Sequence, residues 1–203
     1  MESYNAVTWL LDRNVAEGRG GKLAYADGVS ELTYGGLQEE TCRAANMLRR
    51  LGVRREERVA MIMLDTVDFP IVFLGAIRAG IVPVPLNTLL TADQYAYVLA
   101  DCRARVLFVS EALYPVVKDI VGRMPDLDCV IVSGKNAFGH KLLSEELARE
   151  NDGFETVATH ADEPAFWLYS SGSTGMPKGV ASAWQSRRDR GDLCEAGARH
   201  PRG

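Results

Sequence analysis

The sequence has no pair of cysteines at the close spacing that zinc sites and disulfide frameworks use. Its four cysteines stand singly along 203 residues, at positions 42, 102, 129 and 194. We interpret each one as a small buried apolar residue in a reducing cytoplasm. The histidines His140, His160 and His200 also lack metal-ligand spacing, and we expect all three at the surface. These residues predict no metal site.

An excess of positive charge and long hydrophobic runs are absent as well. The formal net charge is −4 and the pI is about 5.5, which argues against a nucleic-acid surface. The longest apolar region, residues 69–86, is interrupted by Arg78 and by prolines, so we expect no membrane span, and no signal-peptide pattern opens the chain. With 47% hydrophobic and 25% charged residues, the chain is typical of a globular protein with one core.

Neither of the two common glycine-rich nucleotide motifs occurs. The pattern Gly-x-Gly-x-x-Gly is missing, and the nearest match to a Walker A loop has Pro177 in place of its second glycine and Gly179 in place of its hydroxyl residue. What is present is Tyr-Ser-Ser-Gly-Ser-Thr-Gly-Met-Pro-Lys-Gly at residues 169–179, directly after an apolar run. Glycines let backbone N–H groups approach an anion, hydroxyls add donors, and Lys178 adds positive charge. The pattern therefore predicts a loop that holds the phosphates of a nucleotide; a solvated linker is the alternative for a stretch of this composition.

Apolar segments alternate with helical patterns ahead of this loop. The expected strands are residues 59–64, 81–85, 106–110, 129–133 and 165–169, and the expected helices between them are 67–79, 91–102, 111–124 and 142–149. Helices at 5–17 and 37–51, and a hairpin of 23–25 with 31–33, precede them. This order predicts an α/β fold, a mostly parallel sheet with helices on both faces. Because ligands of such sheets bind at the carboxyl ends of strands, we expect the loop at that edge.

Smaller features refine these elements. Thr33 is an expected helix cap, and Thr91 with Gln94 has the spacing of a capping box. Prolines confine the strand at residues 81–85 to an edge or an irregular position. Tyr95 and Tyr97 are interpreted as core and surface packing, with an aryl-binding pocket as the alternative.

The loop resembles the phosphate-binding loop of adenylate-forming enzymes, the superfamily of acyl- and aryl-CoA ligases, luciferases and peptide-synthetase adenylation domains. The resemblance extends over residues 4–180 and includes residues 32–35 and 75–87. The segments 87–97 and 162–171 are most similar to benzoate-CoA ligases and their hydroxybenzoate relatives. The resemblance implies that the fold is the N-terminal part of an adenylate-forming enzyme's large domain.

The resemblance also implies roles for the loop residues. In the family this loop wraps the β- and γ-phosphates of ATP, with Mg²⁺, while a carboxylate attacks the α-phosphorus; coenzyme A then displaces AMP to form a thioester. Pro177 would stiffen the exit of the loop. The implied substrate is a carboxylic acid of aromatic, benzoate type, although the particular acid stays open. The phosphate-contacting residues implied in this way are Ser170, Ser171, Gly172, Ser173, Thr174, Gly175 and Lys178.

The later motifs of the family are missing from the sequence. These are an aromatic-Gly-x-Thr-Glu segment, an aspartate for the ribose and a lysine on a mobile C-terminal domain, so no catalytic residue is assigned. We expect residues 1–180 to form a partial AMP-binding domain without ligase activity of its own. Rival hypotheses are a non-catalytic nucleotide-binding module or a split enzyme completed by a C-terminal chain, and a phosphotransferase, which lacks a recognisable acidic Mg²⁺ partner.

The last residues differ in kind from the rest. Residues 181–203 hold five arginines, no lysine and no periodic apolar pattern, which predicts a disordered tail that does not resemble the family. A reading-frame shift would produce such a tail, and a natural basic interaction tail is the alternative.

Overall fold

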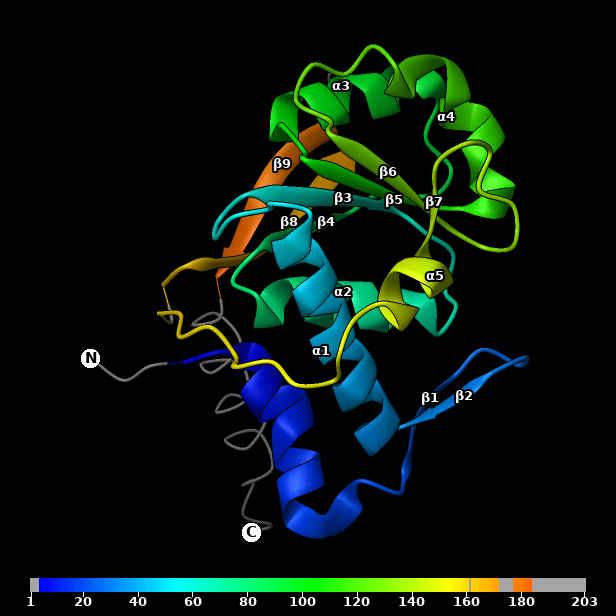
Figure 1. Ribbon diagram of the computed structural model, residues 1–203. Coiled ribbons are helices and arrows are strands. Elements are labelled where there is room, and N and C mark those ends of the chain that lie inside the picture. Colours follow the sequence, from blue (N-terminus) through cyan, green and yellow to red (C-terminus); the bar gives the residue numbers. More distant parts are fainter. Residues whose placement is uncertain (1–3, 161, 172–176, 184–203) are drawn as a thin grey trace, which may run out of the picture.

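A computed structural model describes residues 4–160, 162–171 and 177–183 (Figure 1). Three short sheets and their helices make up this part of the chain. The elements in chain order are η1 (Thr8–Asp12), η2 (Val15–Arg19), β1 (Leu23–Ala26), β2 (Glu31–Thr33), α1 (Tyr34–Arg50), β3 (Arg58–Ile62), α2 (Asp68–Arg78), β4 (Val82–Pro85), α3 (Ala92–Cys102), β5 (Val106–Ser110), η3 (Glu111–Leu113), α4 (Tyr114–Val121), β6 (Cys129–Ser133), β7 (Lys141–Leu142), α5 (Leu143–Ala148), β8 (Pro164–Ser171) and β9 (Pro177–Ala183).

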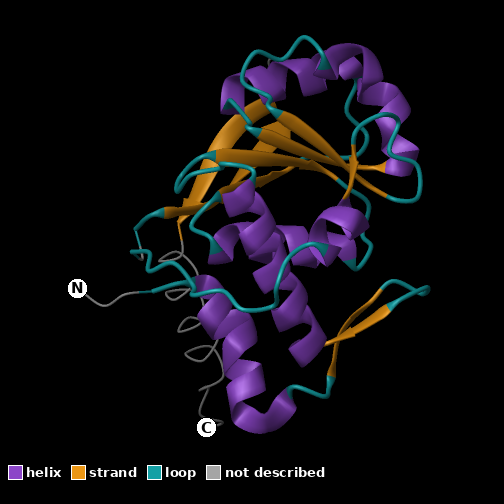
Figure 2. Cartoon of the chain, in the orientation of Figure 1, coloured by secondary structure: helices purple, strands orange, loops and turns teal. Residues whose placement is uncertain are grey.

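A five-stranded parallel sheet in the order β4-β3-β5-β6-β7 forms the centre of the molecule. Helices α1, α2 and α5 cover one face, and α3 and α4 cover the other (Figures 1 and 2). Strand β3 shows why both faces need cover, because Val59 and Met61 belong to the core under α1 and α2 whereas Ala60 and Ile62 belong to the core under α3 and α4. The predicted α/β fold is therefore confirmed.

Most expected elements are present, with local differences. The predicted helix at 111–124 begins as the 3-10 turn η3, and α4 follows with a proline in its first turn. The N-terminal helical segment contains the π-helical stretches η1 and η2, and Gly18, with a φ of 79°, lies inside η2. The two-residue strand β7 was not predicted; it pairs with β6 and leads directly into α5.

The strand that enters the glycine-rich loop lies outside the parallel sheet, contrary to expectation. Strand β8 pairs antiparallel with β9 in a sheet of its own and lies against β4 (Figure 1). The Val82 N–H donates to the Glu57 carbonyl just before β3, and the Leu86 N–H donates to the Met61 carbonyl of β3, so the backbone nitrogens of positions 83 and 85 face away from β3. Both are prolines and have no N–H, which leaves the outer edge of β4 without donors for a further strand. The expectation that this strand belongs to the parallel sheet was therefore wrong, and residues 172–176 of the loop lie outside the described residues.

The smaller predictions have mixed outcomes. Thr33 caps α1 by accepting a hydrogen bond from the Gly36 N–H at 3.1 Å, and both hydrogen bonds of the capping box at α3 are present. Tyr95 is buried and donates to the Asn87 carbonyl at 2.8 Å, whereas Tyr97 is partly exposed, so the packing interpretation is confirmed.

Two of the histidines expected at the surface lie in the described part of the chain, and both are partly exposed. His140 is half-buried, with its Nε2 2.9 Å from the Tyr114 hydroxyl, and His160 is also half-buried. Cys42 and Cys102 are buried as expected and Cys129 is half-buried; all three are free thiols. Burial raises the pKa of each of the three, that of Cys102 to about 11. Cys194 and His200 lie outside the described residues.

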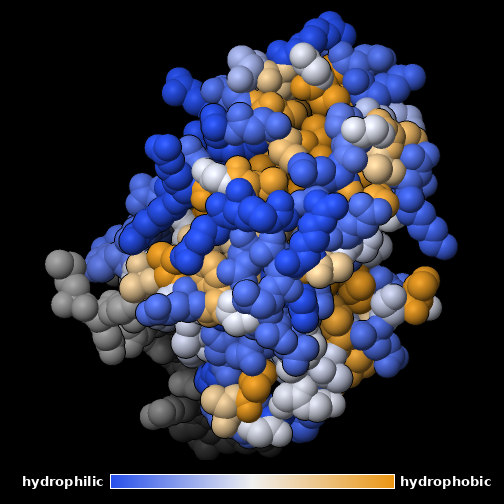
Figure 3. Space-filling view, in the orientation of Figure 1, coloured by the Kyte–Doolittle hydropathy of each residue, from blue (hydrophilic) through white to orange (hydrophobic). Residues whose placement is uncertain are grey.

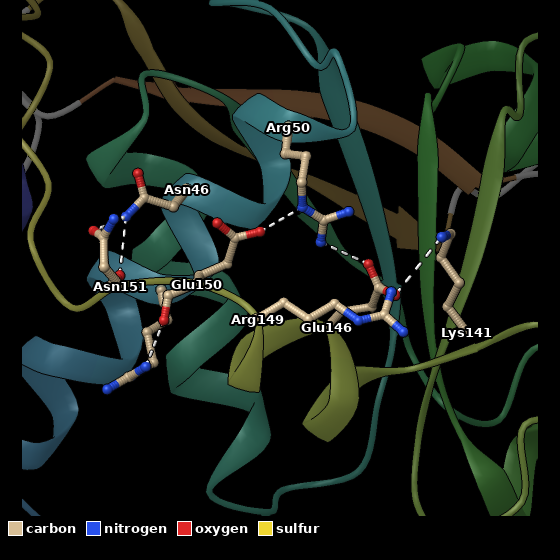
Figure 4. A network of polar contacts seen from close by, with 8 residues as sticks. Asn46, Arg50, Lys141, Glu146, Arg149, Glu150 and Asn151 are labelled. Carbon is tan, nitrogen blue, oxygen red and sulfur yellow. Dashed lines mark hydrogen bonds and ion pairs between the residues drawn. The ribbon is translucent and has the colours of Figure 1, made fainter.

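A network of ion pairs joins α5 to α1. Arg50 of α1 lies between Glu146 and Glu150, and Lys141 and Arg149 also reach Glu146 (Figure 4). The face of the molecule in Figure 3 is predominantly polar across its middle, with apolar side chains in separate patches. Among the described residues, no helix combines the length and the apolar character needed to cross a bilayer.

Candidate functional site: the β8–β9 hairpin

The hairpin brings two of the predicted phosphate-contacting residues to facing positions. In the β8–β9 register Ser170 lies opposite Lys178, and Ser171 lies opposite Pro177. The side chains of Ser170 and Lys178 are exposed, and Pro177 is buried at the start of β9. Gly172, Ser173, Thr174 and Gly175 lie outside the described residues. Strand β9 continues to Ala183, three residues into the predicted tail, and residues 184–203 are again outside the described part.

The two faces of the hairpin differ in character. Trp167 and Tyr169 alternate along β8 and pack against the hydrophobic cluster beneath α3. The cross-strand pair Leu168 and Val180 is 44% and 54% exposed, on the face that also carries Ser170 and Lys178. This face therefore offers a hydroxyl and an ammonium group beside a small apolar patch.

The inner face is fixed to the body of the molecule by polar contacts. The Tyr169 hydroxyl donates to Asp101 Oδ2 of α3 at 2.5 Å. Arg58 donates from Nε to the Cys102 carbonyl at 2.6 Å, and its guanidinium lies 5.5 Å from the centre of the Trp167 ring. Burial, and then the hydrogen bond to Asp101, raise the pKa of Tyr169 well above its usual value. The phenol consequently stays protonated, as a donor must.

The residues that hold the hairpin were missed from the sequence. The alternation of Trp167 and Tyr169 with smaller residues was a usable signal for the inner face. Asp101 gave no such signal, because it belongs to a helix about seventy positions earlier in the chain.

A surface hollow lies away from the hairpin. It is a groove of about 540 Å³ between the N-terminal helical segment, α1 and residues 152–156, and no residue of β8 or β9 lines it. Arg78, which is 3% exposed, pairs there with Asp12 at 2.6 Å and donates to Thr156 at 2.8 Å. These contacts satisfy both terminal nitrogens of the guanidinium within the protein, so the ion pair is explained as packing.

The chemistry of the hairpin suits a polyphosphate. Lysine and hydroxyl groups are common phosphate donors, and they stand here on neighbouring strands at the base of a glycine-rich turn. In the described part of the chain, no group of three or more His, Cys, Asp or Glu residues is arranged to hold a metal ion.

Two solved structures with the same architecture are named as CoA ligases of aromatic acids. The anthranilate CoA ligase AuaEII, in complex with anthranoyl-AMP, matches with a TM-score of 0.87 at 32% identity, over 94% of this chain and 36% of that one. A benzoate CoA ligase from Burkholderia xenovorans matches with a TM-score of 0.82 at 38% identity and the same coverage of both chains.

Curated sequences agree with this class. The 4-hydroxybenzoate–CoA/benzoate–CoA ligase of Rhodopseudomonas palustris is 50% identical over 188 residues, which are 93% of this chain and 35% of that protein. The benzoate–CoA ligase of Thauera aromatica is 44% identical over 180 residues, 88% of this chain and 34% of its own length. The profile of the AMP-binding enzyme family matches residues 11–186, so the chain belongs to this family. It spans about a third of the length of the curated relatives it matches.

Proposed function

We propose that this chain supplies the ATP-phosphate-binding hairpin of a benzoate-type aryl-CoA ligase. The observation that carries the proposal is the pairing of Ser170 with Lys178 on an open hairpin face. Its relatives at 50% and 44% identity are named as benzoate or hydroxybenzoate ligases, which supports an aromatic carboxylic acid as the substrate class.

The reaction explains why these donors are needed. A carboxylate and ATP are both anions, so a site that joins them must neutralise charge. Lys178 would face the β- and γ-phosphates, with Ser170, Ser171 and the residues Gly172, Ser173, Thr174 and Gly175 as further donors. Mg²⁺ would neutralise part of the phosphate charge, and coenzyme A would accept the acyl group. Residues 1–180 are proposed as a partial AMP-binding domain, and residues 187–203, which follow the family match, as a tail unlike the family.

Nucleotide binding tests this role directly. Titration calorimetry with MgATP is expected to show weak binding to the chain, and Lys178→Ala is expected to weaken it by about tenfold, the effect of one charge-assisted contact. Lys135→Ala removes an exposed lysine outside the hairpin and is the matched control. Equal affinities of the Lys178→Ala and Lys135→Ala variants, or no binding by the unaltered chain, would refute the role.

Turnover is proposed to require residues that this chain does not contain. Benzoate-dependent exchange of pyrophosphate into ATP is expected to be absent with the chain alone. It is expected to appear on co-expression with the remaining two thirds of the Rhodopseudomonas palustris relative, a complementing chain that would supply the ribose and carboxylate contacts. Robust exchange by the isolated chain would contradict this division of roles.

A further inference from the structure

The inner face of the hairpin carries a phenol between a carboxylate and a glycine. Tyr169 donates to Asp101 on α3 and lies opposite Gly179 in the β8–β9 ladder. Building on the proposed function, we propose that Tyr169, held by Asp101 and seated on Gly179, is a positioning residue: it fixes the register of the hairpin and so holds Lys178 toward the phosphates.

Gly179 supplies the space for the phenol ring. A Cβ at this position would lie 3.1 Å from Tyr169 Cζ and 3.3 Å from its hydroxyl oxygen. Gly179 is not among the glycines with positive φ, so its backbone conformation does not demand glycine. The need for glycine is therefore steric, and it comes from the ring that crosses β9.

This fit favours the observed register over a slipped one. Side chains alternate between faces along a strand, so a slip of one residue would turn Lys178 to the inner face. The same slip would place Lys178 or Val180, which both carry side chains, opposite Tyr169. Gly179 leaves more room for the ring than either of these residues, so the ring favours the register that keeps Lys178 beside Ser170 on the outer face.

Asp101 fixes the other end of the phenol to a rigid element. It lies in the last turn of α3, a helix that begins with a complete capping box and is anchored by Tyr95, which is 1% exposed. The contact therefore ties residue 169, next to the donor Ser170, to the body of the molecule. A further inner-face contact, Arg58 over Trp167, acts two residues further from the loop.

The first test measures the hairpin without nucleotide. Hydrogen exchange of the amides of residues 169–171 and 178–180 is expected to be about tenfold faster in Tyr169→Phe and in Asp101→Ala, because each loses one hydrogen bond to a charged acceptor. Gly179→Ala is expected to do the same by displacing the ring. Asp101→Asn keeps an oxygen that accepts from the phenol and is expected to restore slow exchange. Tyr97→Phe, on the partly exposed side of α3, is the matched control.

The second test separates positioning from mere stability. MgATP affinity is expected to fall about tenfold in Tyr169→Phe, and to recover in Asp101→Asn relative to Asp101→Ala, while the melting temperature of Tyr169→Phe stays close to that of Tyr97→Phe. Unchanged exchange in Tyr169→Phe would overturn the proposal, as would faster exchange with unchanged affinity. If the unaltered chain binds no MgATP and exchange still responds, the proposed function fails while the hold of Tyr169 on the hairpin stands.

Discussion

Glu146 is a carboxylate at 2% exposure that meets cations from three elements. Arg50 Nη2 lies 2.7 Å away, Arg149 Nη1 2.6 Å and Lys141 Nζ 3.7 Å. Burial by itself would raise the pKa of Glu146, but the hydrogen bond from Arg50 and the charges of Lys141, Arg50 and Arg149 outweigh it and lower the pKa. A carboxyl group with a lowered folded-state pKa stabilises the fold above its unfolded pKa, and this stabilisation is lost as the pH falls through the folded value.

Glu146→Gln is accordingly expected to lower the free energy of unfolding by about 1–3 kcal/mol at pH 7. The cost stays below that of a fully buried pair because the cationic partners are partly exposed. The variant should also lose less stability than the unaltered chain between pH 5 and pH 3, a window set by the ordinary glutamate pKa of about 4.3 and the lowered folded value. Urea unfolding across this range measures both effects. Glu145→Gln, an exposed neighbour on α5, is the control, and an equal acid slope in both variants would contradict the assignment.

Gly75 allows α2 to pack closely against α1. A Cβ on this residue of α2 would lie 2.5 Å from Ala44 Cβ and 3.1 Å from the Thr41 carbonyl oxygen of α1. Gly75→Ala is therefore expected to destabilise the chain by about 1–3 kcal/mol through overpacking, although alanine favours helix. Chemical denaturation measures the difference. Gly122→Ala, where a Cβ would meet nothing within 4 Å, should change stability little; a neutral Gly75→Ala would mean that the helices separate easily.

Some contacts of single residues could be predicted from the sequence, and others could not. Thr33, Thr91 and Gln94 were predictable because capping is local and its donors lie within three residues. The contact of Glu146 with Arg50 was not, since Arg50 comes from a helix 96 positions earlier. The same applies to Asp101 and Tyr169, whose contact depends on how a separate hairpin docks on α3.

At the scale of elements, α3 shows how local hydrogen bonds stabilise the helix on which the hairpin packs. Thr91 Oγ1 accepts from the Gln94 N–H at 3.3 Å, and Gln94 Oε1 accepts from the Thr91 N–H at 3.0 Å. The helix then ends at Arg103, which has a φ of 49°. Its start is therefore stabilised by polar groups, and its inner face by the buried core.

Removing the capping box of α3 is expected to lower the free energy of unfolding by about 1 kcal/mol in Thr91→Ala and by less in Gln94→Ala. The double variant should cost less than the sum of the two, because each bond depends on the geometry that the other supports. A thermodynamic cycle of the four proteins, measured by denaturant unfolding, gives the coupling. Strict additivity would show that the two hydrogen bonds act independently.

Elements were predictable where periodicity decides them. The buried runs of β3, β5 and β6 have no polar residue to break them, and the helices between them have one clear apolar face. The sheet to which β8 belongs was not predictable from its own residues. It depends on the two prolines of the neighbouring strand and on β9, which was expected to be tail from residue 181 onward.

For the whole molecule, the outer hairpin face has an apolar pair in contact with solvent. Leu168 and Val180 lie directly opposite each other and are both about half exposed. The double variant Leu168→Thr, Val180→Thr keeps strand-compatible residues and is expected to reduce self-association of the chain. Sedimentation velocity at increasing concentration measures this. Leu89→Thr, which alters a side chain at 88% exposure elsewhere, is the control; an equal reduction there would mean that the hairpin face is not responsible.

The prolines of β4 also bear on how this protein meets other strands. Amyloid-like growth and runaway oligomerisation both begin when a foreign segment docks on a free sheet edge through main-chain bonds. Pro83 and Pro85 have no N–H group, so the β4 border of the central sheet offers few hydrogen-bond donors to a docking strand. The opposite border consists only of the two-residue strand β7. The two prolines that separate the β8–β9 hairpin from the central sheet thus also disfavour misassembly through this edge.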